Sequence, residues 1–414
     1  MGASKTGGPY QRPISPTEWF YLGAMGLAPP FAIQLVVEGH GRMDRSELSR
    51  AVAVASAACP GARLVRRGRI WVDSGQAPAV RVVDGTAIDR TRFENAEPLR
   101  SPLDPVNGPT CEVLVLAGEP CTVVFRAFHG VMDGRGVLTW MAEVFRALRG
   151  EEPVGARSGA TERSLLSELG TTGARPRLGL NFRSPLDRAG VSAERVARPS
   201  FRWRRRTLDG NFPGLVARVA AAIANVEDAE EVRFMVPVDL RRHDAGLAST
   251  ANLTLPVFVD GRTCDAAEDF HKRLRRALDE RRELSRGTEQ AAARLPLRAL
   301  GTALAAANAV VTRRRRYVCS TLISNLGRVD LCGLSTAGFK ASTVYSLAVR
   351  APLTPASIVT VQAQGRTELT MSYPDGPGMG ARADALFNRI SDELCRVPPR
   401  SGPRTSHSGR TRTR

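Results

Sequence analysis

The chain of 414 residues is long enough for two domains of ordinary size, each with its own core. Its 43% hydrophobic content excludes a disordered protein, and no apolar stretch approaches the length of a membrane span. The net charge of +18 raises the question of nucleic acid, but segment 396–414 alone supplies six arginines and no acid, a third of the excess.

The first 165 residues are predicted to form a mixed α/β domain. Runs of β-branched and apolar residues predict strands, and apolar residues at helical spacing predict helices. Asp44 is a candidate cap of the first helix, with Glu47 three residues further on. The predicted strands are 33–39, 63–65, 69–72, 111–116 and 121–127, and the predicted helices are 44–58 and one that follows residue 134 and ends near 150.

The segment from 151 to about 200 is rich in glycine and proline and loses periodicity, apart from a short predicted helix at 162–169. So long an irregular stretch is unusual inside a compact unit, so a domain boundary is expected here. We predict an N-terminal domain at 1–165, an interdomain linker at 166–200, a C-terminal domain at 201–395 and a disordered basic tail at 396–414.

The second half repeats the mixture of strands and helices, which suggests a pseudo-duplicated architecture. The predicted strands are 201–206, 231–238, 253–259, 318–323, 341–346, 358–363 and 368–373, and the predicted helices are 213–223, 264–285, 302–311 and 381–395.

The seven cysteines are widely spaced and form no Cys-x-x-Cys pair. They argue against a disulfide framework or a zinc site and for a reducing compartment. The first 15 residues also lack the apolar stretch of a secretory signal. Together these features predict a cytoplasmic protein.

The most informative segment is 128–134, Phe-His-Gly-Val-Met-Asp-Gly, an HxxxDG element between a predicted strand and a predicted helix. A histidine at the end of a strand, with an aspartate four residues on, suits a general base with an orienting carboxylate. Two alternatives stay open on the residues alone: His129 as a structural histidine, and Asp133 as a helix cap. No Gly-x-Ser-x-Gly or Cys/His pattern supports a serine or cysteine nucleophile.

Residues 128–134 match the core of the HHxxxDG signature of the condensation-domain superfamily, which this chain resembles. The superfamily includes nonribosomal peptide synthetase condensation domains, chloramphenicol acetyltransferase, polyketide-associated acyltransferases and plant BAHD acyltransferases. Further segments are similar to those of the family, in the family's order: 14–18, the turn 103–109, the segment 236–242 with Asn252 downstream, and 324–330, which reads Ser-Asn-Leu-Gly-Arg-Val-Asp. The resemblance covers residues 14 to about 395 and is greatest to the condensation-domain-like and polyketide-associated acyltransferase branch.

The resemblance implies two chloramphenicol-acetyltransferase-like domains in a pseudo-dimeric V, with a tunnel at their interface. A thioester donor, acyl-coenzyme A or an acyl-carrier protein, would enter from one side, and a small-molecule alcohol or amine acceptor from the other. His129 would take the acceptor proton on Nε2 and then protonate the departing thiolate. The resemblance implies no bound cofactor or metal, and we expect a monomer.

The resemblance also implies supporting roles. Asp133 would be structural and would pair with an arginine, for which Arg63 and Arg241 are the candidates. Gly134 would allow the tight turn into the following helix, and Asn325 would lie near the developing oxyanion. Substrate contacts are expected from Phe128, Arg135 and Ser324.

The chain departs from the family at Phe128, which replaces the first histidine of the signature. This change favours simple acyl transfer over amide-forming peptide condensation. The plant-type DFGWG loop is absent, and no adenylation segment or carrier-protein serine motif is attached. We therefore expect an acyltransferase that acts in trans in bacterial specialised metabolism, such as antibiotic biosynthesis.

Several alternatives remain. One is a stand-alone condensation-type synthase that acts on carrier-protein substrates. Another is a non-catalytic scaffold that binds carrier proteins, which a tunnel blocked by Phe128 or Trp140 would favour. A nucleic-acid-binding protein would use the positive charge, but the chain has no recognised motif for it, so no nucleic-acid partner is expected. The arginine run 313–316 is either solvated or a phosphate contact to coenzyme A or a carrier arm.

Overall fold

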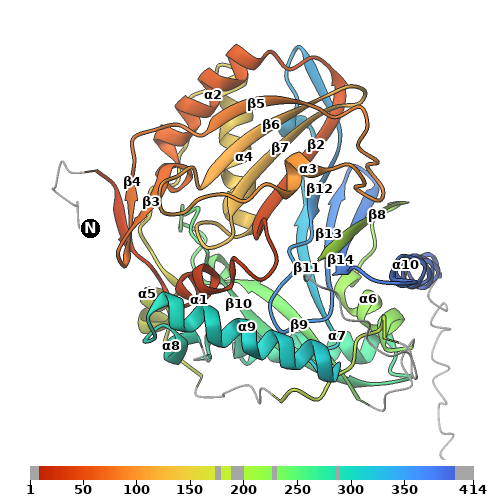
Figure 1. Ribbon diagram of the computed structural model, residues 1–414. Helices are drawn as coiled ribbons and strands as arrows, with labels where there is room; N and C mark the ends of the chain where they lie inside the picture. Colours follow the sequence, from red (N-terminus) through yellow and green to blue (C-terminus); the bar gives the residue numbers. More distant parts are fainter. Residues whose placement is uncertain are drawn as a thin grey trace, which may run out of the picture.

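The computed structural model describes residues 9–172, 179–187, 200–225, 231–285, 287 and 289–396. Within these residues the chain forms three sheets with helices packed around them, which confirms the predicted mixed α/β class (Figure 1). The helices are α1 (Pro16–Ala24), α2 (Arg45–Ala58), α3 (Glu97–Arg100), α4 (Gly134–Leu148), α5 (Glu162–Leu169), α6 (Leu215–Ala224), α7 (Ala267–Asp279), α8 (Glu289–Ala292), α9 (Leu297–Arg314) and α10 (Met379–Cys395).

One sheet of five strands carries the first half of the chain. Its order is β12 (Phe339–Leu347), β2 (Ala32–Gly41), β7 (Cys121–Phe128), β6 (Cys111–Ala117) and β5 (Ala79–Asp84). The central strands β2, β7 and β6 pair antiparallel and are almost wholly buried, which explains why they read as continuous apolar runs. Helices α2 and α4 contact each other beside this sheet.

A second sheet of six strands belongs to the second half. Its order is β10 (Thr254–Arg262), β9 (Glu231–Asp239), β11 (Thr321–Arg328), β13 (Ser357–Ala363), β14 (Arg366–Pro374) and β8 (Phe201–Asp209). Strand β11 pairs parallel with both β9 and β13, whereas β14 pairs antiparallel with β13 and β8. A small third sheet consists of β1 (Gln11–Pro13), β4 (Ile70–Asp73) and β3 (Leu64–Arg67).

A strand and a helix from the second half of the chain pack against the first half. Strand β12 comes from the second half of the chain but pairs with β2 in the first sheet, from Phe339 opposite Gly41 to Leu347 opposite Gln34. Helix α9 likewise packs against α1, and its Leu300 and Leu304 belong to the core of the first sheet. Elements from the second half therefore pack on the first sheet, which brings side chains from both halves to the end of β7.

Three predicted elements differ from the structure by more than three residues at one end. Helix α7 ends at Asp279 and not near 285, because Arg281 adopts a left-handed backbone with φ of 50° that ends the helix. Helix α9 begins at Leu297 and not at 302, directly after Pro296. Strand β11 runs from Thr321 to Arg328 and not from 318 to 323, because its pairing with β13 continues to Asn325 and resumes at Arg328 after an irregularity.

The predicted division at 166–200 remains a prediction, because 173–178 and 188–199 lie outside the described residues. The predicted basic tail likewise lies outside them, except for Arg396. The pseudo-dimeric V also remains an expectation.

Candidate active site

The segment 128–134 turns the chain from β7 into α4. Phe128 ends the strand and is completely buried, and its carbonyl accepts a hydrogen bond from Val131 N at 2.8 Å. His129 N donates to the carbonyl of Phe31 at 3.1 Å, which fixes the histidine to the segment before β2. Backbone hydrogen bonds alone therefore fix the chain at Phe128 and at His129.

The His129 side chain lines a cavity of about 290 Å³. Its Nδ1 lies 3.3 Å from the carbonyl oxygen of Met132, an acceptor, so Nδ1 carries the proton and Nε2 keeps its lone pair. The ring of Tyr21 lies against the imidazole, with centroids 4.5 Å apart. Burial lowers the pKa of His129 below its ordinary value of 6.5, against the smaller opposing effects of the Met132 carbonyl and Asp133. The imidazole is consequently neutral at neutral pH, the form a general base requires.

Asp133 is buried and caps α4. Its Oδ1 accepts from Gly136 N at 2.7 Å, and its Oδ2 accepts from Leu253 N at 2.8 Å and from Thr254 Oγ1 at 3.0 Å. Arg241 Nη1 donates to Oδ2 at 3.0 Å. Burial alone would raise the pKa of Asp133, but the Arg241 charge and these hydrogen bonds outweigh it, so its pKa lies below 3.8. Asp133 is therefore an ionised clamp between the two halves.

Arg241, and not Arg63, is the partner of Asp133. The guanidinium of Arg241 also bonds Asp239 Oδ1 at 2.8 Å and Ala251 O at 2.6 Å. Arg63 pairs instead with Asp73 on β4. The arginine that reaches Asp133 thus comes from the other half of the chain, 108 residues away in sequence.

Sequence reasoning missed part of this clamp. Asn252, noted only as part of a similar segment, donates from Nδ2 to the carbonyl of His129 at 2.8 Å. Gly136 was not singled out, yet a Cβ there would collide with the backbone carbonyl of Thr250, so the first turn of α4 packs directly on the second half. A second glycine two residues after Gly134, inside a predicted helix, was the available signal.

The other predicted site residues fall into two groups. Arg135, Ser324 and Asn325 line the same cavity as His129, and Gly134 lines it beside Leu326. Asn325 lies on β11, and its Oδ1 accepts hydrogen bonds from Gly327 N at 2.9 Å and Thr360 Oγ1 at 3.1 Å. Phe128, in contrast, points into the core and is not among the residues that line the cavity.

The structure also bears on other readings of the sequence. Within the described residues, no group of three or more His, Cys, Asp or Glu side chains is placed to hold a metal ion. No single helix there is long and apolar enough to cross a membrane, and the pair that passes only jointly, Arg282–Ala292 with Leu297–Arg314, is bent by 111°. Trp140 is buried in the core, where its Nε1 donates to Ser56 Oγ at 3.0 Å, and it does not line the cavity.

This chain is similar to known proteins in its structure. No protein-family description and no curated protein matches the sequence. The condensation domain from the monacolin K polyketide synthase MokA is similar with a TM-score of 0.59 and 12% identity, over 92% of this chain and 97% of that chain.

The starter condensation domain of the rhizomide synthetase RzmA is also similar. A variant of it in complex with C8-CoA has a TM-score of 0.63 and 14% identity, over 94% of this chain and 95% of that chain. A second variant, in complex with C8-CoA and Leu-SNAC, has a TM-score of 0.62 at 14% identity, with the same coverage. The chain therefore has the fold of the condensation domains, as its sequence motifs predicted.

Proposed function

We propose that this protein is an acyltransferase of the condensation-domain superfamily, which moves an acyl group from a thioester to an alcohol or amine. One observation carries the proposal. The neutral imidazole of His129 lines a cavity between the two halves, with Nδ1 held by the Met132 carbonyl and Nε2 left as an acceptor. This is the arrangement that a general base needs.

In the proposed reaction, His129 Nε2 accepts the proton of the acceptor O–H or N–H as that atom attacks the thioester carbonyl carbon. A tetrahedral intermediate forms with a negative charge on the former carbonyl oxygen. Its collapse breaks the carbon–sulfur bond, and the imidazolium returns the proton to the departing thiolate. The products are an ester or amide and a free thiol, so His129 ends as it began. Such proton transfer contributes roughly 10²–10⁴-fold in rate, and positioning both substrates contributes further.

The surrounding residues serve this step in the proposal. Two hydrogen bonds hold the His129 loop to the second half: Asp133 accepts one from Arg241, and the His129 carbonyl accepts one from Asn252. Asn325 lines the cavity, and its Oδ1 accepts hydrogen bonds from Gly327 and Thr360, so its amide N–H groups would be the donors for the oxyanion. Arg135 and Ser324 line the cavity and would contact substrate.

The choice of donor rests on the neighbours. The RzmA starter condensation domain is similar to this chain and is described in complex with C8-CoA, which supports a coenzyme A thioester as donor here. A cavity blocked by Phe128 or Trp140 would favour the alternative, a non-catalytic scaffold. Because both side chains lie in the core and neither lines the cavity, we favour the enzyme.

The proposal is tested with the purified full-length protein. It is incubated with alcohol and amine acceptors and a panel of acyl thioesters of coenzyme A, carrier protein and N-acetylcysteamine. Mass spectrometry detects the acylated product, and a thiol reagent measures thiol release. We expect acceptor-dependent thiol release with at least one pair. Failure of every coenzyme A, carrier-protein and N-acetylcysteamine thioester to yield acylated product would count against an acyltransferase.

A further inference from the structure

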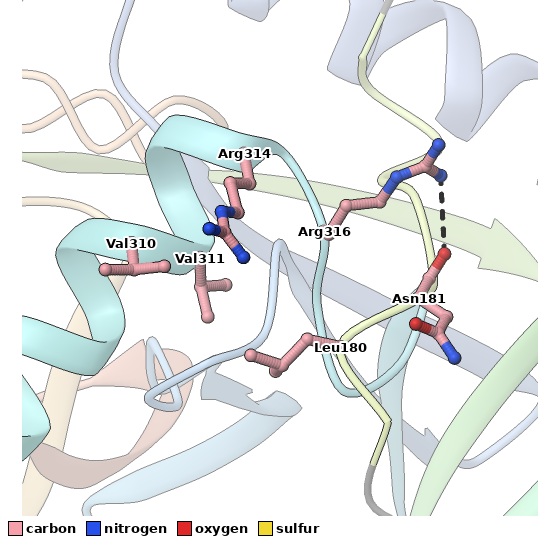
Figure 2. Close-up of a pocket in the computed structure, with 6 residues that line it drawn as sticks. All are labelled: Leu180, Asn181, Val310, Val311, Arg314 and Arg316. Carbon is pink, nitrogen blue, oxygen red and sulfur yellow. Dashed lines mark hydrogen bonds between the residues drawn. The ribbon is translucent and has the colours of Figure 1, made fainter.

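A second cavity, of about 410 Å³, lies beside the C-terminal end of α9 (Figure 2). We call it the α9 pocket. None of its lining residues lines the His129 cavity, so it is a separate feature of the surface. It is lined by Leu180, Asn181, Val310, Val311, Arg314 and Arg316.

The α9 pocket is unusually cationic. It includes two of the four arginines of the run 313–316, and within the described residues none of those four guanidinium groups forms an ion pair with a carboxylate. Arg313 and Arg314 are in the last turn of α9, where the helix dipole favours a cation. Arg316 lies beyond the helix end, so the dipole does not account for it. Its Nη1 donates to the carbonyl of Asn181 at 3.3 Å, which holds its guanidinium at the rim of the pocket (Figure 2).

The rest of the pocket is apolar. Leu180 is 42% exposed and Val310 is 44% exposed, and both are among the few large apolar side chains left in solvent within the described residues. Val311 completes this wall. The pocket combines exposed aliphatic side chains with the guanidinium groups of Arg314 and Arg316, which have no carboxylate partner among the described residues. Such a hollow suits a ligand that has a flat aromatic ring and phosphates. A nucleotide has both.

A short segment and two hydrogen bonds connect the α9 pocket to residues that line the His129 cavity. Arg316 lies two residues before Val318, which lines that cavity. Val318 N donates to the carbonyl of Leu353 at 3.3 Å, and Leu353 also lines the cavity. The side chain of Asn308 on α9 in turn accepts from Leu353 N at 3.2 Å. A ligand in the α9 pocket would therefore lie next to the part of the cavity wall formed by Val318 and Leu353.

Arg350 adds positive charge on the same side. It precedes Ala351, which lines the His129 cavity, and its guanidinium bonds only the carbonyl and hydroxyl of Thr354 among the described residues. Burial lowers the pKa of Arg350 to about 10. A cation that is partly withdrawn from water and has no carboxylate partner among the described residues gains from a nearby anion.

We propose that the α9 pocket binds the nucleotide end of a coenzyme A thioester, with Arg314 and Arg316 contacting its phosphates and Leu180 and Val310 packing on its adenine. The proposal rests on the proposed function and specifies its donor. The pantetheine arm would then pass along the Val318–Leu353 wall into the His129 cavity. A carrier protein also holds its arm through a phosphate, at the end opposite the thiol, but it offers no adenine for the apolar wall.

The test uses adenosine 3′,5′-bisphosphate as a probe, with binding to the full-length protein measured by calorimetry. The pocket variant is Arg314→Ala/Arg316→Ala. The matched control is Arg294→Ala/Arg298→Ala, which removes the same charge from exposed positions at the other end of α9. We expect the dissociation constant of the pocket variant to rise roughly tenfold to hundredfold, as the loss of charge-assisted hydrogen bonds predicts. The control should bind as the wild type does, and the wild-type affinity should fall with added salt.

Kinetics separate this proposal from the proposed function. In the pocket variant the KM for an acyl-coenzyme A should rise by a similar factor, while the KM for the matching N-acetylcysteamine thioester, which has no phosphate, should not change. Wild-type protein that does not bind the probe, or a pocket variant that binds it equally well, would overturn the proposal. A KM effect with phosphopantetheine donors but no binding of the probe would overturn it in favour of a carrier protein. Probe binding that depends on the arginines, in a protein inactive on all thioesters, would support the pocket and refute the acyltransferase.

Discussion

Replacing Asp133 by alanine is expected to destabilise the protein by about 3–5 kcal/mol, as for a buried ion pair that loses one partner. The carboxylate accepts four hydrogen bonds, one each from Gly136 N, Leu253 N, Thr254 Oγ1 and Arg241 Nη1. Alanine leaves all four donors without this acceptor, at about 1–3 kcal/mol for each buried one. The loss stays below their sum because Arg241 keeps Asp239 and two backbone carbonyls as partners.

The assay is thermal unfolding followed by circular dichroism. Unfolding entropy of about 2.1 cal/mol/K per residue gives about 0.9 kcal/mol/K for this chain, so the midpoint should fall by roughly 3–6 °C. The midpoint of Asp133→Asn should fall about half as far. The amide oxygen can still accept from the donors that bond Oδ2, so this variant loses only the hydrogen bond from Gly136 N and the negative charge. An Asp133→Ala protein that melts within 1 °C of the wild type would refute the clamp.

The same pair predicts a dependence on pH. Because the folded pKa of Asp133 lies below the unfolded value of 3.8, its stabilising effect is complete above that value and is lost as the pH falls through the folded pKa. The stability difference between wild type and Asp133→Ala should therefore shrink below about pH 4. A difference that is constant from pH 7 to pH 3 would show that the carboxylate is not held ionised by Arg241.

The remaining predictions concern the loop and its histidine. The acid limb of kcat/KM should have an apparent pKa below 6.5, since burial lowers the pKa of His129, and a limb above 7 would contradict this assignment. Gly136→Ala should reduce thermal stability and soluble yield, because the new Cβ would collide with the Thr250 carbonyl. Gly26→Ala is the control, since the space around Gly26 is open. Equal unfolding midpoints for the two variants would refute the close approach at Gly136. Asn252→Ala should lower kcat by roughly tenfold or more through displacement of the His129 backbone, and an unchanged kcat would remove Asn252 from the positioning residues.

Much of the fold was predictable because the local patterns are strong. Helix α5 has its predicted bounds, Glu162–Leu169, and the strand before His129 and the helix after it are both present. Helix α1 was missed although Ser15 and Glu18 form a capping box directly ahead of an apolar run, so the signal was there. The crossing of β12 into the first sheet has no local signal, because it depends on pairing with β2, about 300 residues away.

The site shows the same division between local and long-range information. The role of Asp133 as a cap of α4 could be anticipated, since an aspartate directly precedes a helical pattern. The choice between Arg63 and Arg241 could not, because each was a reasonable partner until tertiary structure placed Arg63 on Asp73. Phe128 was expected to contact substrate from its position in the motif. The structure instead buries its side chain in the core of the first sheet, whereas the neighbouring His129 lines the cavity.

The most direct test of the central claim is the effect of His129→Ala on kcat/KM for the best thioester and acceptor pair. His271→Ala, which removes an exposed histidine on α7, is the control. If His129 is the general base, its variant should lose roughly 10²–10⁴-fold in kcat/KM while its melting temperature stays close to that of the wild type, and the control should keep full activity. A folded His129→Ala protein that turns over at the wild-type rate would contradict the account.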